Sequence, residues 1–200
     1  MMTTEDNSVN IEKPAGAYHH GDLRAALVDA GMALLEQRRS DDLSLREVAR
    51  SAGVSATAVY RHFPDKDALM RAIAARGFGM MGAMQAKAAL GHPGPGAFAA
   101  TGTAYVKFAL KHPAVFRLMF SCAPPRDPFS MPDSGQPAPL QMLRANAASL
   151  TPPGASDEAR KIIAVRAWAL VHGLAVLMLD QMVEADDALI AAVIEAAQIA

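Results

Sequence analysis

Residues 43–63 read LSLREVARSAGVSATAVYRHF, and this stretch decides the fold. Its Ser44 and Glu47 have the S-x-x-E spacing of a capping box, which predicts a short helix that opens directly after the serine. Gly53 is expected to end that helix, because glycine adopts a positive φ without a Cβ penalty. Ser55 then has the side chain of an N-cap, so a second short helix is expected to follow it.

Small and apolar residues in the same stretch predict that the two helices cross closely. Ala49 leaves room where the two backbones approach each other, and Val48, Val54 and Val59 are spaced to fill the wedge between them. Caps, turn and apolar spacing all agree with one geometry, that of a helix-turn-helix. The second helix of such a unit can enter the major groove of DNA and place its first residues on base edges.

Nine residues of this region are candidates for contact with DNA. Thr57 can offer its hydroxyl to a base or its methyl group to thymine. Tyr60 and His62 are expected at phosphate oxygens, and the starts of the neighbouring helices also suit phosphate. The predicted set is Ser44, Arg46, Ser55, Ala56, Thr57, Tyr60, Arg61, His62 and Lys66.

Residues 18–71 resemble the DNA-binding domain of the TetR family of bacterial regulators. The resemblance is carried by YHHGDLRAALVDAG at 18–31, SLREVARSAGVS at 44–55 and AVYRHFPDKDALM at 58–70. It implies a homodimer whose two recognition helices read a palindromic DNA operator. One position departs from the pattern, because members often have a glycine after the first helix where this chain has Arg38-Arg39-Ser40.

The composition favours an all-α fold of about nine helices. Alanine and leucine dominate a hydrophobic content of 52%, and β-branched residues rarely run together. We interpret residues 1–17 as a disordered arm, 18–64 as a three-helix, helix-turn-helix DNA-binding domain, and 65–200 as a helical ligand-binding and dimerisation domain. Asp22 is a candidate N-cap for the first helix, which is expected to end near Arg38. The later helices are expected at about 66–89, 97–111, 113–120, 139–149, 157–183 and 187–199.

The charge of the chain gives no sign of a polycation. The formal net charge is −1, and residues 18–71 carry eight Lys or Arg and eight Asp or Glu. A basic face is usual for a DNA-binding domain. Since the salt dependence of binding follows the number of phosphates that the protein neutralises, we expect a modest dependence here.

The helix expected at 157–183 is apolar on more than one face. A helix of this kind needs cover on nearly all sides, so we expect one face to pack on its own domain and another on a second copy. With the last helix it would form a two-fold, four-helix interface through residues 157–199. The alternative is that both faces belong to the core of one chain. Arg166, His172 and Asp180 favour a helix of a soluble protein over a membrane span, so no membrane partner is expected.

Methionine and aromatic residues predict an effector pocket among the fourth to eighth helices. The candidates are Met84, Phe108, Phe116, Met119, Phe120, Trp168, His172 and Met178. The alternative is that they form ordinary core, with His172 as a hydrogen-bonded core histidine. The run Trp168 to Gly173 resembles the W-x-x-x-H-G signature of one subgroup of TetR C-terminal domains, and HPAVFRLMF at 112–120 resembles a segment of that subgroup.

The sequence therefore indicates a ligand-responsive, DNA-binding transcriptional regulator. The resemblance implies a repressor that binds a double-stranded operator and is released by a small apolar effector. Two alternatives remain, a helical protein-interaction module and a regulator that senses oxidation through Cys122. The six histidines lack metal-ligand spacing and no catalytic motif is present, so we expect no enzyme activity, cofactor or metal. A single cysteine and an N-terminus without a signal-peptide pattern suit the cytoplasm.

Overall fold

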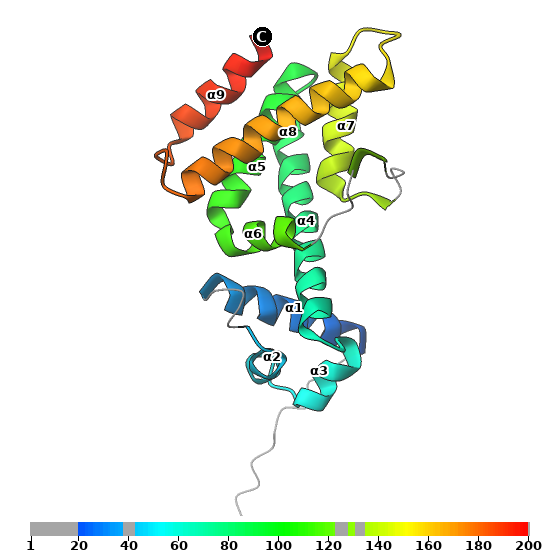
Figure 1. Ribbon diagram of the computed structural model, residues 1–200, viewed down its shortest axis with the longest axis vertical. Coiled ribbons are helices and arrows are strands. Elements are labelled where there is room, and N and C mark those ends of the chain that lie inside the picture. The colour runs from blue at the N-terminus through cyan, green and yellow to red at the C-terminus, as the bar shows by residue number, and fades with distance from the viewer. Residues whose placement is uncertain (1–19, 38–42, 123–127, 131–134, 200) are drawn as a thin grey trace, which may run out of the picture.

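The computed structural model describes residues 20–37, 43–122, 128–130 and 135–199 (Figure 1). Within these ranges the chain forms nine α-helices and a short 3-10 helix, and contains no β-strand, which confirms the all-α prediction. The elements are α1 (His20–Gln37), α2 (Leu45–Ser51), α3 (Ala56–His62), α4 (Lys66–Ala89), α5 (Pro95–Lys111), α6 (Pro113–Ser121), η2 (Pro128–Ser130), α7 (Ala138–Leu150), α8 (Asp157–Leu179) and α9 (Asp187–Ile199).

The helices gather at two ends of an elongated molecule, and α4 joins them. Figure 1 shows α1, α2 and α3 at one end, with α5 to α9 around the far half of α4. With 24 residues, α4 is about 36 Å long. It contacts α1 near its start and α5, α6 and α7 farther along. A movement of α4 at one end is therefore transmitted to the other.

The smaller end forms one part of an apolar core that continues into the larger end. Its fully buried side chains come from all of α1 to α4, and they include Leu27, Leu35, Val48, Val59, Phe63, Leu69 and Ile73. The guanidinium carbon of Arg24 lies 5.0 Å from the centre of the Phe63 ring, which adds a cation–π contact at the edge of this core. The short α2 and α3 are held by this packing rather than by their length.

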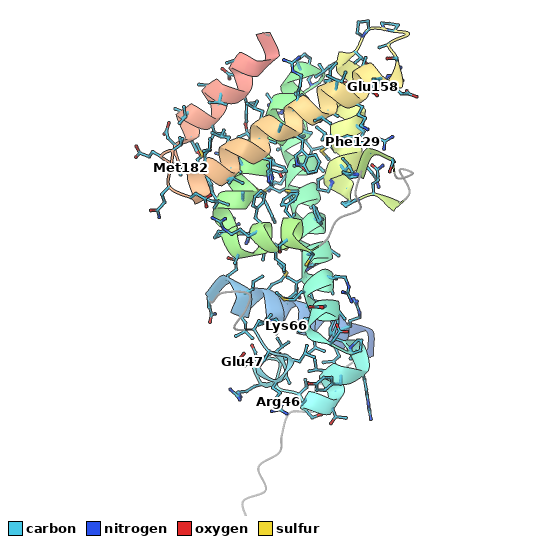
Figure 2. All side chains as sticks on the ribbon, in the orientation of Figure 1. Arg46, Glu47, Lys66, Phe129, Glu158 and Met182 are labelled. Atoms are coloured by element: carbon cyan, nitrogen blue, oxygen red, sulfur yellow. The ribbon has the colours of Figure 1, made fainter. Side chains whose placement is uncertain are left out.

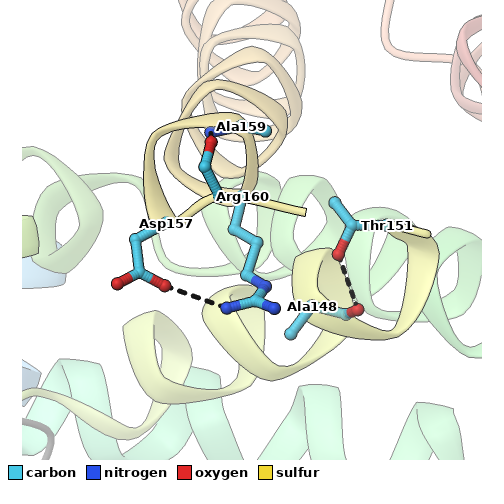
Figure 3. A network of polar contacts seen from close by, with 6 residues as sticks. Ala148, Thr151, Asp157, Ala159 and Arg160 are labelled. Carbon is cyan, nitrogen blue, oxygen red and sulfur yellow. Dashed lines mark hydrogen bonds and ion pairs between the residues drawn. The ribbon is translucent and has the colours of Figure 1, made fainter. Parts of the chain in front are cut away.

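The ends of several helices follow from local hydrogen bonds. At the start of α8, the Ala159 N–H donates to Ser156 Oγ at 3.2 Å, and Arg160 pairs with Asp157 at 2.9 Å (Figure 3). At the end of α7, the Thr151 hydroxyl donates to the Ala148 carbonyl at 2.8 Å. These contacts cap the end of α7 and the start of α8.

Three helix boundaries differ from those expected. α1 begins at His20, so Asp22 lies inside the helix rather than at its N-cap. α5 begins at Pro95 instead of residue 97, because proline fits the first position of a helix, where its missing N–H costs nothing. The expected arm at 1–17 and the Arg38 to Ser40 loop lie outside the described residues.

The third difference is at the end of α8, which stops at Leu179 rather than at Val183. Gln181 adopts a positive φ of 58°. Its N–H donates to the Met178 carbonyl at 3.1 Å, and the Met182 N–H donates to the Leu177 carbonyl at 2.9 Å. These two bonds form a Schellman motif, which ends a helix and usually uses glycine at the position that Gln181 occupies here.

Candidate DNA-binding and effector sites

The capping box at the start of α2 is present as predicted. The Glu47 N–H donates to Ser44 Oγ at 3.3 Å, and the Ser44 N–H donates to a carboxylate oxygen of Glu47 at 3.1 Å. At the start of α3, the Ala58 N–H donates to Ser55 Oγ at 3.2 Å. Both short helices of the pair thus begin at the serines that the sequence indicates.

The turn between α2 and α3 also has the predicted geometry. Gly53 has a φ of +69°, and the Val54 N–H donates back to the Ala49 carbonyl at 2.9 Å. Ala49 is 3% exposed, and Val48 and Val59 are fully buried. The two helices therefore meet through small and apolar side chains, and the opposite face of α3 is left at the surface.

The outward face of α3 carries most of the predicted base-reading residues. Ser55, Thr57 and Arg61 are exposed and Tyr60 is 51% exposed, whereas Ala56 and His62 are partly buried. On the neighbouring helices, Ser44 and Arg46 are exposed and Lys66 is partly buried. Figure 2 shows Arg46 at the end of the molecule formed by α2 and α3, away from α8. The described geometry thus presents a short helix with hydroxyl, phenol and guanidinium groups to a partner.

A cavity of about 820 Å³ lies between α4, α6, α7 and α8. Its volume is within the range of small-molecule sites, and most of its described lining is apolar. Three predicted effector residues line it, namely Met119, Phe120 and Trp168. Met81, another methionine of the same apolar set, also lines it, and lining residues that the sequence analysis did not name include Phe78, Gln85, Tyr105, Gln136, Leu140 and Leu143.

The other five predicted effector residues are placed behind or beside this lining. Phe108, Phe116 and Met178 are buried in the core, and Met84 packs against the core from a partly buried position. His172 is half-buried among aromatic rings, with its ring centre 4.7 Å from that of Phe120. These residues support the cavity wall instead of facing the space inside the described part of the cavity.

A polar triad backs the aromatic wall of the cavity. The Trp168 indole N–H can only donate, and it donates to the Tyr105 oxygen at 3.3 Å. The Tyr105 hydroxyl and His172 Nδ1 share a hydrogen bond at 2.9 Å. Burial raises the pKa of Tyr105 and lowers the pKa of His172, so both groups stay neutral around pH 7. The triad fixes the orientation of the Trp168 ring that lines the cavity.

α6 connects the cavity to the smaller end of the molecule. Its Met119 and Phe120 line the cavity. At its start, the Ala114 N–H donates to Glu36 Oε2 on α1 at 3.4 Å, and His112 Nδ1 lies 3.6 Å from Glu36 Oε1. A carboxylate is favourable at a helix N-terminus, where the helix dipole is positive. α6 therefore contacts both α1 and α4 while it lines the cavity.

The lone cysteine lies on the wall of the same cavity. Cys122 is partly buried, and burial is the main reason that the pKa of its thiol is raised. A raised pKa reduces the fraction of reactive thiolate near pH 7. The geometry thus gives no support to the alternative in which this thiol senses oxidation. Among the described residues, no group of three or more His, Cys, Asp and Glu side chains is arranged to hold a metal ion.

α8 has an apolar face that the described part of the chain leaves uncovered. Ile162 is 52% exposed, Val165 is 42% exposed and Leu177 is 40% exposed, with Ala169 between them at the surface. By length and composition alone, α8 could cross a membrane, and only 22% of its most apolar window is buried within the chain. The residues that the structure describes within one chain do not cover this face, and an exposed apolar patch of this kind is typical of an interaction surface.

Two families match this chain, one at each end. Residues 27–73 match "Bacterial regulatory proteins, tetR family", and residues 98–197, half of the chain, match "Tetracyclin repressor-like, C-terminal domain". An uncharacterized helix-turn-helix-type transcriptional regulator of Haemophilus influenzae is 55% identical over 47 residues. That match spans 23% of this chain and 23% of the relative's length, so it concerns only a part of each protein.

Solved structures match over most of the chain. A protein of unknown function from Rhodococcus sp. RHA1 is 32% identical, covering 91% of this chain and 94% of its own, with a TM-score of 0.70. The multidrug binding protein EbrR, solved in complex with imidazole, is 20% identical and covers 92% of this chain and 96% of its own, with a TM-score of 0.56. At that identity, the second likeness concerns the fold.

Proposed function

Since this chain belongs to the TetR family of bacterial transcriptional regulators, we propose that it is a repressor which binds a palindromic operator as a homodimer and is released by a small apolar effector. Its class, a DNA-binding transcriptional regulator and not an enzyme, follows from the family. The observation that supports the DNA-reading role most directly is α3, with Val59 fully buried and Tyr60 on the next position 51% exposed. We propose the cytoplasm as its location, where the operator is.

The proposed operator contact can be tested by selecting the DNA fragments of the source genome that the protein retains. We expect an enriched site with two related half-sites, one for each recognition helix of a dimer, with centres about 34–36 Å apart. Fluorescence anisotropy with that site and with a scrambled duplex then measures specificity at a stated salt concentration. Equal affinity for the selected and scrambled duplexes would rule out a sequence-reading role.

A homodimer through α8 and α9 is proposed because it would cover the exposed apolar face. Ile162, Val165 and Leu177 lie along this face of α8, and Leu189 of α9 is 36% exposed. Ala169 is small and central on the face, so two such helices can approach closely. Burying this area between copies removes apolar surface from water at about 25 cal/mol per Å² before the costs of association.

The dimer has a direct test in the substitution Ala169→Arg. Two guanidinium groups facing each other at the centre of an apolar interface are strongly unfavourable, so we expect monomers in sedimentation equilibrium. Ala83→Arg, at an exposed position of α4, serves as the matched control and should leave the dimer intact. A wild-type chain that sediments as a monomer at micromolar concentration contradicts the proposed interface.

Effector release is proposed to work through the two helices that the cavity and the DNA-binding end share. α4 lines the cavity at Phe78 and Met81 and begins at Lys66, directly after α3. α6 lines it at Met119 and contacts Glu36 of α1. A ligand that favours another position of these helices changes the spacing of the two recognition helices in a dimer.

The protein EbrR, which has this fold and is described as multidrug binding, supports a ligand role for the cavity. A coupling free energy of about 1–3 kcal/mol between ligand and operator is typical of allostery and corresponds to about 5- to 150-fold. Operator affinity with and without a bound ligand measures it. An affinity that is unchanged when the cavity is saturated contradicts the effector role.

A further inference from the structure

Gln85 lines the large cavity and carries a buried hydrogen-bond acceptor. The residue lies on α4 and is 7% exposed. It lines the large cavity and also a neighbouring one of about 610 Å³, so it stands between the two. Within the described part of the chain, Gln85 Oε1 is buried and has no hydrogen-bond partner.

The orientation of this amide is fixed by its other atom. Gln85 Nε2 donates to the Thr101 carbonyl on α5 at 3.2 Å. If the amide were reversed, Oε1 would face another carbonyl oxygen and the bond would be lost. Thr101 is held in turn, because its hydroxyl donates to the Phe98 carbonyl at 2.8 Å and accepts from Asn146 Nδ2 of α7 at 3.2 Å. The network between α4, α5 and α7 therefore directs Oε1 away from the protein donors.

We propose that the effector is an elongated, largely apolar molecule with a hydroxyl or N–H group that donates to Gln85 Oε1. This inference rests on the effector role proposed for the cavity. A buried acceptor without a partner is unfavourable, so a ligand that supplies a donor there gains more than its apolar contacts provide. The rest of the site is suited to apolar and aromatic groups, because Phe78, Phe120 and Trp168 line it.

The length and charge of the cavity lining further limit the kinds of effector that fit the site. Residues of α4 from Arg71 to Gln85 line the cavity, which corresponds to about 21 Å along the helix axis. Arg71 is exposed and marks the open end. No carboxylate is present among the described lining residues, and the only charged side chain there is a cation. Among the residues that the structure describes, the lining thus suits a neutral donor better than an ammonium group, which would need a carboxylate partner in an apolar site.

The test compares probes that differ only in the donor. 4-Alkylphenols carry a hydroxyl, and the corresponding 4-alkylanisoles carry the same ring and chain with the hydroxyl methylated. Trp168 is the only tryptophan of the chain and lines the cavity, so its fluorescence reports binding. We expect the phenol of each pair to bind about 5- to 150-fold more tightly, because the ether leaves Oε1 without a donor. Both series should bind more tightly as the alkyl chain lengthens from butyl to nonyl.

A variant pair assigns the effect to Gln85. Gln85→Met removes the acceptor and keeps a side chain of similar length, so the preference for the phenol should disappear. Lys87→Met changes an exposed residue of the same helix and should keep it. Equal affinities within each pair for the wild-type protein, failure of the phenols to bind, or a preference that survives in a folded Gln85→Met protein each overturn the inference. The wild-type comparison alone is decisive if circular dichroism shows that Gln85→Met is unfolded.

Operator release by the same probes separates this inference from the function on which it rests. If phenol and ether release the operator at equal concentrations, the role of Gln85 is overturned and the effector function stands. If the phenol binds more tightly but the operator affinity does not change, the cavity binds the predicted chemistry and the effector function fails.

Discussion

Two glycines on α4, two residues apart, should respond in opposite directions to the same substitution. Gly77 is buried, and a Cβ built on it lies 2.7 Å from Met119 Sδ and 2.7 Å from Val115 Cγ1. Gly79 is exposed, and a Cβ there meets nothing within 4 Å. In a helix interior alanine is more favourable than glycine by about 1 kcal/mol, and this gain is common to both positions.

Steric overlap at Gly77 makes the free energies of unfolding of the two variants differ. Gly79→Ala keeps the gain and should raise the free energy of unfolding by about 1 kcal/mol. In Gly77→Ala the new methyl group overlaps a stiff β-branched side chain, and overpacking of this kind costs about 1–3 kcal/mol. Because the propensity gain cancels in the comparison, the difference between the two variants should itself be about 1–3 kcal/mol.

Urea denaturation at one fixed protein concentration measures this difference. The urea midpoint should be highest for Gly79→Ala, and the midpoint of Gly77→Ala should lie at or below that of the wild type, with equal slopes if the same surface is exposed on unfolding. Gly77→Ala should also weaken effector coupling, because it separates α4 from the α6 segment that carries Met119. If both variants are equally stable, α4 and α6 are not in the close contact on which the proposed coupling depends.

Three further substitutions test separate parts of the molecule. Gln181→Gly should raise the free energy of unfolding by about 1 kcal/mol, since the φ of 58° at this position favours glycine. Thermal unfolding measures the change, and an unchanged Tm would contradict the Schellman motif at the end of α8. Burial lowers the pKa of His172, so the unfolded state binds the proton more readily and stability should be lost as pH falls below about 6.5. His172→Gln should reduce that loss in acid denaturation curves. Lys66→Ala should weaken binding to all operators and lower the salt slope by about one, whereas Thr57→Ala should change the preference among operator variants.

The helix-turn-helix could be predicted in detail because its signals are local. Ser44, Ser55 and Gly53 each act on backbone groups within a few residues, so residue type and spacing determine the geometry. The end of α8 could not be predicted in the same way. Gln181 takes the left-handed position where glycine is usual, so the sequence offers no stop signal, and the apolar pattern continues to Val183.

The cavity was only partly predictable because its lining depends on which helix faces which. Met119, Phe120 and Trp168 are large and apolar, and composition alone selects such residues. Whether Phe116 supports the wall or Phe120 faces the space depends on the rotation of α6 against α4 and α8, which is a property of the packed structure. In the sequence, Gln85 is marked only as a single amide in the largely apolar run GMMGAMQAKAAL. Helical periodicity does not show that its oxygen lacks a hydrogen-bond donor.

The neutral count of charges over residues 18–71 does not describe the face that α3 presents. Several of the carboxylates are directed elsewhere in the structure. Glu47 closes the capping box, and Asp65 accepts from the Ala68 N–H at 2.6 Å. Asp29 pairs with Arg76 on α4, and Glu36 contacts the start of α6.

These carboxylates are therefore engaged in caps and in contacts toward the larger end of the molecule. Arg46, Arg50 and Arg61 on α2 and α3 are all exposed. The local field at the recognition helix is consequently more positive than the sequence count implies, although the number of cations that can reach phosphate stays small. From this placement we expect the log–log slope of operator affinity against salt concentration to be clearly above zero in magnitude but well below the roughly ten of strongly basic repressors. A slope near either limit would contradict the placement.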